Sequence, residues 1–554
     1  MDVATNYEQW ASAASAVDQI DGKEAWKADP VSPDYDYELL QSRIRQLRAA
    51  REAGDVSAMI FLLRSSLSRH LADMGNPRNY AATHTGTKHL IEGFIDEVVQ
   101  QLHMLADAEH DEWPSEDARY EFFVNMRHAY GRTALLLSGG GTLGISHIGV
   151  LRALKECSLI PRVISGASSG SIVASIICTH TDDELDALMQ PVTHGRCQNF
   201  FDSFEVDGVY SKLKRFVTDG VFYDAESIKR SVRGTLGDVT FQEAFNRTRR
   251  VLNIAVSSAT VFEMPRLLNY LTTPNVVIWS AVIASCAVPV VFQSSPLMVK
   301  DEKGNVVPWD LGGHRWIDGS VENDLPMNKL SELFNINHFI VCQVNPHVIP
   351  FIRDKPVNTP WNRASSWAMR LAVQEVYHRL TQLDDVGIMR SLTSRLRSIV
   401  SQRYVGDITI LPRIDWSRFL GLLTNPSDEA ITEFIQNGER STWPKIPIIR
   451  NHCRIEMTID EIIYRLRLRR LDAFKHTIPR SLVPRSAIHC HTSRPVTRPD
   501  TSDAGAPMRQ QFWRRSSAGA AQESALREEQ VLTSMPTLCV SPAEANTIDA
   551  DHPL

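Results

Sequence analysis

Residues 133–157 read TALLLSGGGTLGISHIGVLRALKEC, and this stretch decides the fold. Its first part, Thr133 to Ser138, is an apolar run that ends in glycines, which predicts a buried strand. Its second part, Ile145 to Cys157, repeats apolar side chains at helical spacing. A strand, a tight turn and a helix are therefore expected, with free backbone N–H groups where the helix begins.

A second turn, Gly166-Ala167-Ser168-Ser169-Gly170, lies between a predicted strand at Val163 to Ser165 and a predicted helix at Ser169 to Thr179. In a Gly-x-Ser-x-Gly turn the serine occupies a sharp bend, and flanking residues larger than Gly166 and Gly170 would clash there. The bend pushes the serine hydroxyl out of the turn. Ser168 is therefore the candidate nucleophile.

A serine hydroxyl is a weak nucleophile, so it needs a base and a site for the negative charge that its attack creates. Asp318 follows a short predicted strand, Arg315 to Ile317, and a carboxylate in a dry pocket can take the proton directly. Backbone N–H groups of a glycine turn can point at the charge without obstruction by side chains. The candidate oxyanion donors are Gly139, Gly140, Gly141 and Gly144.

Each motif alone is weak, because short patterns match often by chance and Asp-Gly also occurs at Asp21, Asp207 and Asp219. The spacing strengthens them: the glycines at 139–141 lie 27 to 29 residues before Ser168, the length of one strand-loop-helix-strand unit. Both turns should then meet at the carboxyl edge of one parallel sheet, where open α/β sheets bind ligands. An α/β-hydrolase with a Ser-Asp-His triad is an alternative, but that fold usually places several strands before its nucleophile.

These motifs resemble those of the patatin-like lipid acyl hydrolases, in which Ser168 and Asp318 would be the Ser-Asp dyad and the glycine turn the oxyanion loop. Over most of its length the chain is similar to the fungal lipid-droplet triacylglycerol lipases and their plant oil-body relatives. Those proteins carry a helical domain of unknown function before the patatin domain. The stretches that carry this similarity are His84–Lys88, Leu90–Glu92, Gly144–Leu151, Ala284–Pro289 and Asp318–Pro326.

The resemblance implies hydrolysis of long-chain acylglycerol esters through an acyl-serine intermediate, without a metal or cofactor, and it favours triacylglycerol as the substrate. The residues themselves do not separate triacylglycerol from phospholipid or lysophospholipid. A non-catalytic lipid-surface protein is a further alternative, which the intact Ser168, Asp318 and glycine loop disfavour. Relatives have been credited with an acyltransferase activity linked to His-x-x-x-x-Asp, but no histidine here has an aspartate five positions on.

Composition limits the partners and the compartment. A net charge of −6 excludes nucleic-acid binding through an overall basic surface. The eight cysteines occur singly, which suits a reducing compartment. The amino terminus lacks a basic segment followed by an apolar one, so no secretory signal is expected. The expected location is cytoplasmic, peripheral on a lipid droplet or the endoplasmic reticulum membrane.

The predicted fold is α/β, and four regions are expected. Residues 1–130 form a helical domain, 131–350 a patatin-like catalytic domain, 351–485 a mostly helical extension and 486–554 a disordered tail. Alternating strands and helices from Thr133 predict a parallel sheet with helices on both faces. The apolar run from Val276 to Phe292 is short for a membrane span, which needs about 20 residues, and predicts a buried helix followed by a strand from Val290.

Two segments are candidates for contact with a lipid surface. The apolar residues between Trp361 and Val376 recur at helical spacing and are expected to pack inside the protein. A basic run fits either anionic headgroups or a plain solvated helix face, and the residues alone do not decide between them. That run consists of Arg465, Arg467, Arg469, Arg470 and Lys475.

His147 and Cys286 are expected to be packed side chains rather than catalytic ones.

Overall fold

The computed structural model describes residues 4–108, 115–189, 226–258, 266–287, 295–309, 316–318, 324–345, 404–413 and 426–477, with residues 1, 113, 348 and isolated positions between 367 and 382. All of these belong to one unit of the chain, Met1–Thr477. The predicted strand from Val290, most of the amphipathic stretch after Trp361 and the tail 486–554 lie outside the described residues.

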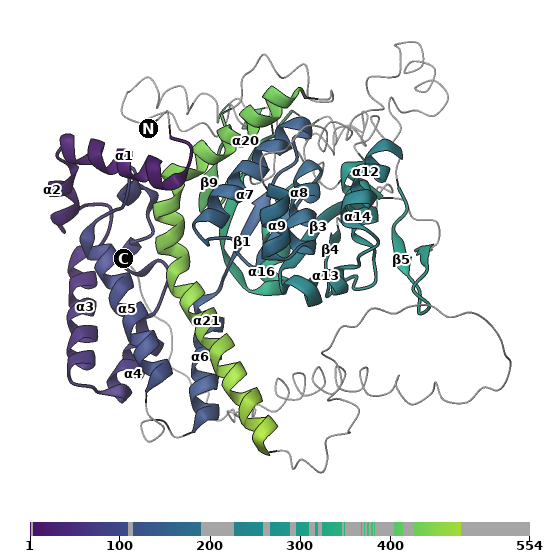
Figure 1. Ribbon diagram of the computed structural model, residues 1–554. Coiled ribbons are helices and arrows are strands. Elements are labelled where there is room, and N and C mark those ends of the chain that lie inside the picture. Colours follow the sequence, from purple (N-terminus) through teal and green to yellow (C-terminus); the bar gives the residue numbers. More distant parts are fainter. Residues whose placement is uncertain are drawn as a thin grey trace, which may run out of the picture. The chain divides into compact units, whose positions relative to one another are not determined.

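A seven-stranded sheet lies at the centre of the catalytic region, in the order β4-β3-β2-β1-β8-β9, with β7 also paired to β3 (Figure 1). Its strands are β1 (Arg132–Leu137), β2 (Val163–Gly166), β3 (Val251–Ser258), β4 (Arg266–Leu268), β7 (Trp316–Asp318), β8 (Ile336–Cys342) and β9 (Ile408–Ile410). The five strands from β3 to β9 along this order are parallel, as predicted. The short strands β4 and β7 run antiparallel to β3, so the sheet is mixed at one end. Strands β5 (Met298–Lys300) and β6 (Val306–Pro308) form a separate hairpin.

Helices cover both faces of this sheet. Side chains alternate along a strand, and in β1 Leu135 and Leu137 join a core with the helices on one face, while Ala134 and Leu136 join a second core on the other. The first face carries α7 (Ser146–Glu156), α8 (Ser169–Thr179), α12 (Glu226–Leu236), α14 (Ile278–Cys286) and α20 (Asp428–Thr442). The second carries α16 (Met327–Phe334). Helices α9 (Asp182–Met189) and α13 (Phe241–Thr248) complete this region. The predicted α/β fold with helices on both faces is confirmed.

The apolar run that could have been mistaken for a membrane span is interior structure. All nine residues of α14 are buried, and they pack in the core above the sheet. The prediction of a buried helix is therefore confirmed. No helix in the described part of the chain is long and apolar enough to cross a membrane.

The amino-terminal region is helical, as predicted. Its helices are α1 (Tyr7–Ile20), α2 (Lys23–Ala28), α3 (Tyr37–Glu52), α4 (Val56–Ser66), α5 (His89–Asp107) and α6 (Glu116–Tyr130). Side-chain caps mark several helix starts: Asp36 accepts the N–H of Leu39, and Asp55 that of Ala58. Helices α3 to α6 enclose a core separate from the two cores of the sheet.

One long helix, α21 (Ile446–Thr477), joins these cores (Figure 1). Its first turns place Ile446, Ile449 and Cys453 in the core of the sheet. Its later turns place residues such as Ile459 and Leu466 in the core of the amino-terminal helices. A segment that the sequence assigns to a carboxyl-terminal extension therefore contributes apolar surface to both parts of the protein.

The basic residues of α21 hold it on the amino-terminal helices. Arg469 pairs with Asp107 at 3.1 Å, Arg465 lies 3.5 Å from the same carboxylate, and Arg470 pairs with Asp117. These arginines therefore serve the packing of α21 on α5 and α6.

The apolar stretch after Trp361 also departs from the expectation. Trp367 is 66% exposed and Leu371 is 44% exposed, so the prediction of interior packing is wrong for these two residues. The other residues of that predicted stripe lie outside the described part of the chain.

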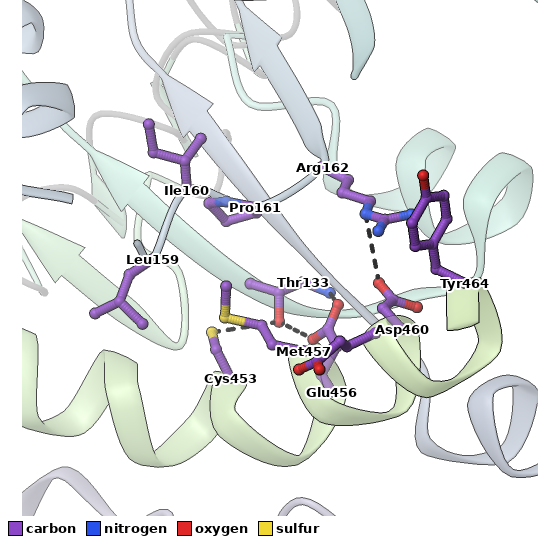
Figure 2. Close-up of a pocket in the computed structure, with 11 residues that line it drawn as sticks. Thr133, Leu159, Ile160, Pro161, Arg162, Cys453, Glu456, Met457, Asp460 and Tyr464 are labelled. Carbon is purple, nitrogen blue, oxygen red and sulfur yellow. Dashed lines mark hydrogen bonds and ion pairs between the residues drawn. The ribbon is translucent and has the colours of Figure 1, made fainter. Parts of the chain in front are cut away.

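A buried carboxylate, Glu456, fastens α21 to the sheet (Figure 2). It accepts hydrogen bonds from the Thr133 N–H at 3.0 Å and from the Thr133 hydroxyl. It also pairs with Arg69 at 2.9 Å and Arg127 at 3.0 Å, both from the amino-terminal helices. A buried charge is tolerated only when such partners replace its water, so this one residue ties three parts of the chain together.

We therefore expect Glu456→Gln to lower the free energy of unfolding by about 3–5 kcal/mol, because it leaves the buried Arg69 guanidinium without its carboxylate partner and Arg127 with Asp460 alone. Urea unfolding followed by circular dichroism measures this. The matched control is Glu461→Gln, an exposed position on the same helix, which should change stability by at most about 0.5 kcal/mol. Equal effects of the two substitutions would contradict the assignment.

Candidate active site

Ser168 lies on a strained bend between β2 and α8. Its φ is +49° and its ψ −125°, a conformation that costs a non-glycine residue about 1–3 kcal/mol. The neighbouring glycines make the bend possible: a Cβ at Gly166 would lie 2.4 Å from the Gly170 carbonyl oxygen, and one at Gly170 would lie 2.2 Å from that of Leu137. No side chain fits at either position.

A hydrogen-bond bridge from α14 holds this bend in place. The Ser285 hydroxyl, fully buried, accepts the N–H of Ser168 at 3.0 Å and donates to the Ala255 carbonyl of β3 at 2.8 Å. The backbone of the strained residue is thereby fixed to the neighbouring strand. Sequence reasoning did not single out Ser285, although it lies in one of the stretches that resemble the family.

The pairing of β3 explains where Asp318 lies relative to Ser168. Val256 pairs with Arg266 of β4 and with Asp318 of β7, so those two strands lie on opposite sides of β3. Strand β7 is therefore on the side of β3 that β2 occupies, where Gly166 pairs with Ile254. Two residues of strand span about 7 Å, so Asp318 lies just beyond the point at which β2 turns away into the bend.

The expectation for the third strand therefore needs one correction. Strand β7 enters the sheet from its carboxyl edge, antiparallel to β3, and Asp318 is its last residue rather than the first residue after it. The antiparallel direction brings Asp318 to the same edge as Ser168. The side chain is fully buried, and the Asp318 N–H donates to the Ala287 carbonyl just after α14 at 3.0 Å.

The Cys286 thiol interacts with both predicted catalytic residues. Burial raises the pKa of this thiol well above its usual value, the Asp318 carboxylate contributes to the rise, and hydrogen bonds with Ser171 and Ser168 oppose the shift. The thiol therefore stays protonated, as expected for a packed side chain.

The glycine loop does not offer all of the N–H groups that the sequence predicts. The Gly139 N–H donates to Asp324 at 3.0 Å, so it is already occupied. Among the described residues, the N–H groups of Gly140 and Gly141 make no hydrogen bond, since they precede the first bonded turn of the short helix Gly141–Ile145. Gly144 supplies space instead, because a Cβ there would lie 2.5 Å from the Ser169 hydroxyl.

His147 supports the glycine loop from below. Its Nε2 lies 2.9 Å from the Ser138 carbonyl oxygen and its Nδ1 3.0 Å from the Cys342 sulfur. Burial lowers the pKa of His147 to about 4, so the ring is neutral. No histidine in the described ranges hydrogen-bonds Ser168, which disfavours a Ser-Asp-His triad.

The hollow in Figure 2 is separate from the candidate active site. It has a volume of about 260 Å³ and is lined by Thr133, Ile160 and residues of α21. Thr133 and Ile160 lie at the amino ends of β1 and β2, whereas Ser168 follows the carboxyl end of β2. This hollow is therefore at the edge of the sheet opposite the candidate site.

Comparison with known proteins agrees with this architecture. Residues 1–128 match a domain of unknown function, DUF3336, and residues 135–330 match the patatin-like phospholipase family. The chain is 40% identical to triacylglycerol lipase ptl3 of Schizosaccharomyces pombe, over 84% of this chain and 96% of that protein. It is 40% identical to triacylglycerol lipase 4 of Saccharomyces cerevisiae and 38% identical to triacylglycerol lipase SDP1L of Arabidopsis thaliana, over 83% and 84% of this chain. It spans 52% and 58% of those two longer proteins.

The chain therefore belongs to the patatin-like phospholipase family of lipid acyl hydrolases, as its motifs suggested. In the described part of the chain, no group of three or more His, Cys, Asp or Glu side chains could hold a metal ion.

Removing the Ser285 bridge should impair the site more than the fold. Ser285→Ala leaves the Ser168 N–H and the Ala255 carbonyl unpaired, so we expect kcat on a short soluble ester to fall about tenfold with little change in KM. The matched control is Ser280→Ala in the same helix. The Ser280 hydroxyl likewise accepts one N–H, from Met298, and donates to one carbonyl, that of Val277, but remote from Ser168.

Both substitutions should lower the melting temperature, because each leaves a buried backbone N–H without its hydroxyl acceptor. Only Ser285→Ala should slow the reaction of Ser168 with a fluorophosphonate probe. If Ser280→Ala slows it equally, the bridge has no specific part in holding the nucleophile.

Proposed function

We propose that the protein hydrolyses long-chain acylglycerol esters through Ser168 and Asp318. The observation that carries this proposal is the register of β3, which puts Asp318 beside the strained turn of Ser168. Asp318 would take the proton from the Ser168 hydroxyl as its oxygen attacks the ester carbonyl carbon.

The negative charge on the carbonyl oxygen would be held by the N–H groups of Gly140 and Gly141. Collapse of this state would break the ester bond, and Asp318 would return its proton to the departing alcohol oxygen. Water, deprotonated by Asp318, would then attack the acyl-Ser168 carbonyl. The bond to Ser168 Oγ would break, Asp318 would return the proton to Oγ, and the fatty acid would be released. No step needs a metal ion or a cofactor.

Triacylglycerol is the substrate that the relatives favour, since three of the most similar ones are named triacylglycerol lipases. Phospholipid and lysophospholipid are the alternatives within this family. Assays of the purified protein on emulsions of trioleoylglycerol, dioleoylphosphatidylcholine and oleoyl-lysophosphatidylcholine separate them. Preference for either phospholipid would contradict the assignment of triacylglycerol but not that of an acyl hydrolase.

Long-chain acylglycerols do not dissolve in water, so the protein must reach them at a lipid surface. We propose peripheral adsorption to a lipid droplet or to the endoplasmic reticulum membrane. The exposed side chains of Trp367 and Leu371 support this, because aromatic and aliphatic groups on a helix can enter the headgroup boundary.

The dyad is tested by Ser168→Ala and Asp318→Asn. Each should remove nearly all hydrolysis, and the double variant should be little worse than either, because the two residues act as a unit. A fluorophosphonate probe should label the wild type at Ser168, and EDTA should leave the rate unchanged. Substantial turnover by Asp318→Asn would point to another base, and an active wild type that resists the probe would exclude an acyl-serine intermediate.

A further inference from the structure

A second buried carboxylate, Asp324, holds the glycine loop. It lies just before α16 and is 2% exposed. One carboxylate oxygen accepts the Gly139 N–H at 3.0 Å, and the other accepts the side-chain amide of Asn345 at 2.6 Å. Gly139 follows β1 and Asn345 follows β8, the neighbouring strand, so Asp324 joins the chain segments that leave two central strands of the sheet.

The residues on either side of Gly139 are also held against the chain that follows β8. The Ser138 hydroxyl accepts the N–H of Val344 at 2.9 Å, and a Cβ at Gly140 would lie 2.8 Å from a methyl carbon of Val344. The loop can therefore slide little against the end of β8. Its remaining freedom is rotation of the peptides after Ser138, and the bond from Gly139 to Asp324 fixes the first of them.

The buried position of Asp324 is unfavourable for a charged carboxylate. Burial raises the pKa of Asp324 to about 7, the nearby Asp318 carboxylate raises it further, and the hydrogen bond from Gly139 opposes the shift. Among the described residues, the Tyr404 phenol and the neutral side-chain amides of Gln343 and Asn345 also interact with it. Burying a second acid beside Asp318 costs stability, so a role in the site explains its presence better than a contribution to folding.

We propose that Asp324 is a positioning residue for the oxyanion loop: by holding the Gly139 N–H it turns the N–H groups of Gly140 and Gly141 toward the ester oxygen at Ser168. This inference rests on the proposed function. The hydrogen bond, and not the charge, does the positioning. A neutral acceptor of the same shape should therefore replace Asp324, and an apolar residue of the same shape should not.

Two variants that keep the branching of aspartate at Cγ separate these possibilities. Asp324→Leu keeps the shape and removes both acceptor oxygens, so we expect kcat on a short soluble ester to fall about 10- to 100-fold with KM little changed, because loss of one oxyanion donor costs about 10²–10³. Asp324→Asn keeps an acceptor for Gly139, and rotation of the Asn345 amide can restore the second bond. Its kcat should stay within about fivefold of the wild type.

A matched control removes a buried carboxylate elsewhere. Asp18 is fully buried and accepts the N–H groups of His84 and Thr85 at 2.9 and 3.1 Å, in the amino-terminal helices. Asp18→Leu should lower the melting temperature without changing kcat per molecule that a fluorophosphonate probe can label. Asp324→Leu should lower kcat on the same per-molecule basis.

Stability gives an independent readout. A carboxyl whose folded pKa is raised contributes stability at low pH, and this contribution is lost as the pH rises through about 7. The wild type should therefore lose stability relative to Asp324→Asn between pH 5 and pH 8. A residue retained for folding would show the reverse, with Asp324→Asn the less stable protein at pH 8.

The proposal is overturned if Asp324→Leu keeps wild-type kcat, or if Asp324→Asn is as impaired as Asp324→Leu while folded. If Asp324→Leu does not fold, Asp324→Asn still tests the inference through its kcat and its stability at pH 8. An inactive wild type that the probe does not label would instead contradict the proposed function, so the two failures are distinguishable.

Discussion

One side of β3 organises the site. Strand β2 pairs with the first half of β3, and β7 pairs with its last residues. Gly166 pairs with Ile254, and Asp318 pairs with Val256, two positions further along β3. Because β2 must leave β3 before β7 can pair there, the chain has to turn sharply at Ser168. The sharp bend at Ser168 and the position of Asp318 are therefore two consequences of the same pairing.

The strain of that bend is balanced by buried polar contacts from the end of α14. Ser285 holds the Ser168 backbone, and the Ala287 carbonyl accepts the N–H of Asp318. Two residues of one short segment therefore contact both members of the predicted dyad. In a dry interior each such group must have a partner. The same requirement explains why Gly139 gives its N–H to Asp324.

The amino-terminal helices and the catalytic sheet depend on each other through α21. This helix contributes apolar residues to both cores, and its Glu456 neutralises Arg69 and Arg127 while capping the first residues of β1. A change in the helical region can therefore reach the strand that carries the glycine loop. The basic residues farther along α21 have carboxylate partners on α5 and α6, which makes them part of this joint.

The sequence by itself determined most local elements and the family. Helix α8 begins and ends at the predicted residues, Ser169 and Thr179, because periodicity records which face of an element is buried. The candidate residues Ser168 and Asp318 could be named because each lies in a glycine turn, and such a turn can be recognised from adjacent residues alone. Tertiary structure alone decided that β7 is antiparallel, that Gly139 gives its N–H to Asp324, and that Ser285 holds the backbone of Ser168. Each of these depends on partners at least 100 residues apart in the chain, or on the pairing of strands, and neither leaves a periodic trace in the sequence.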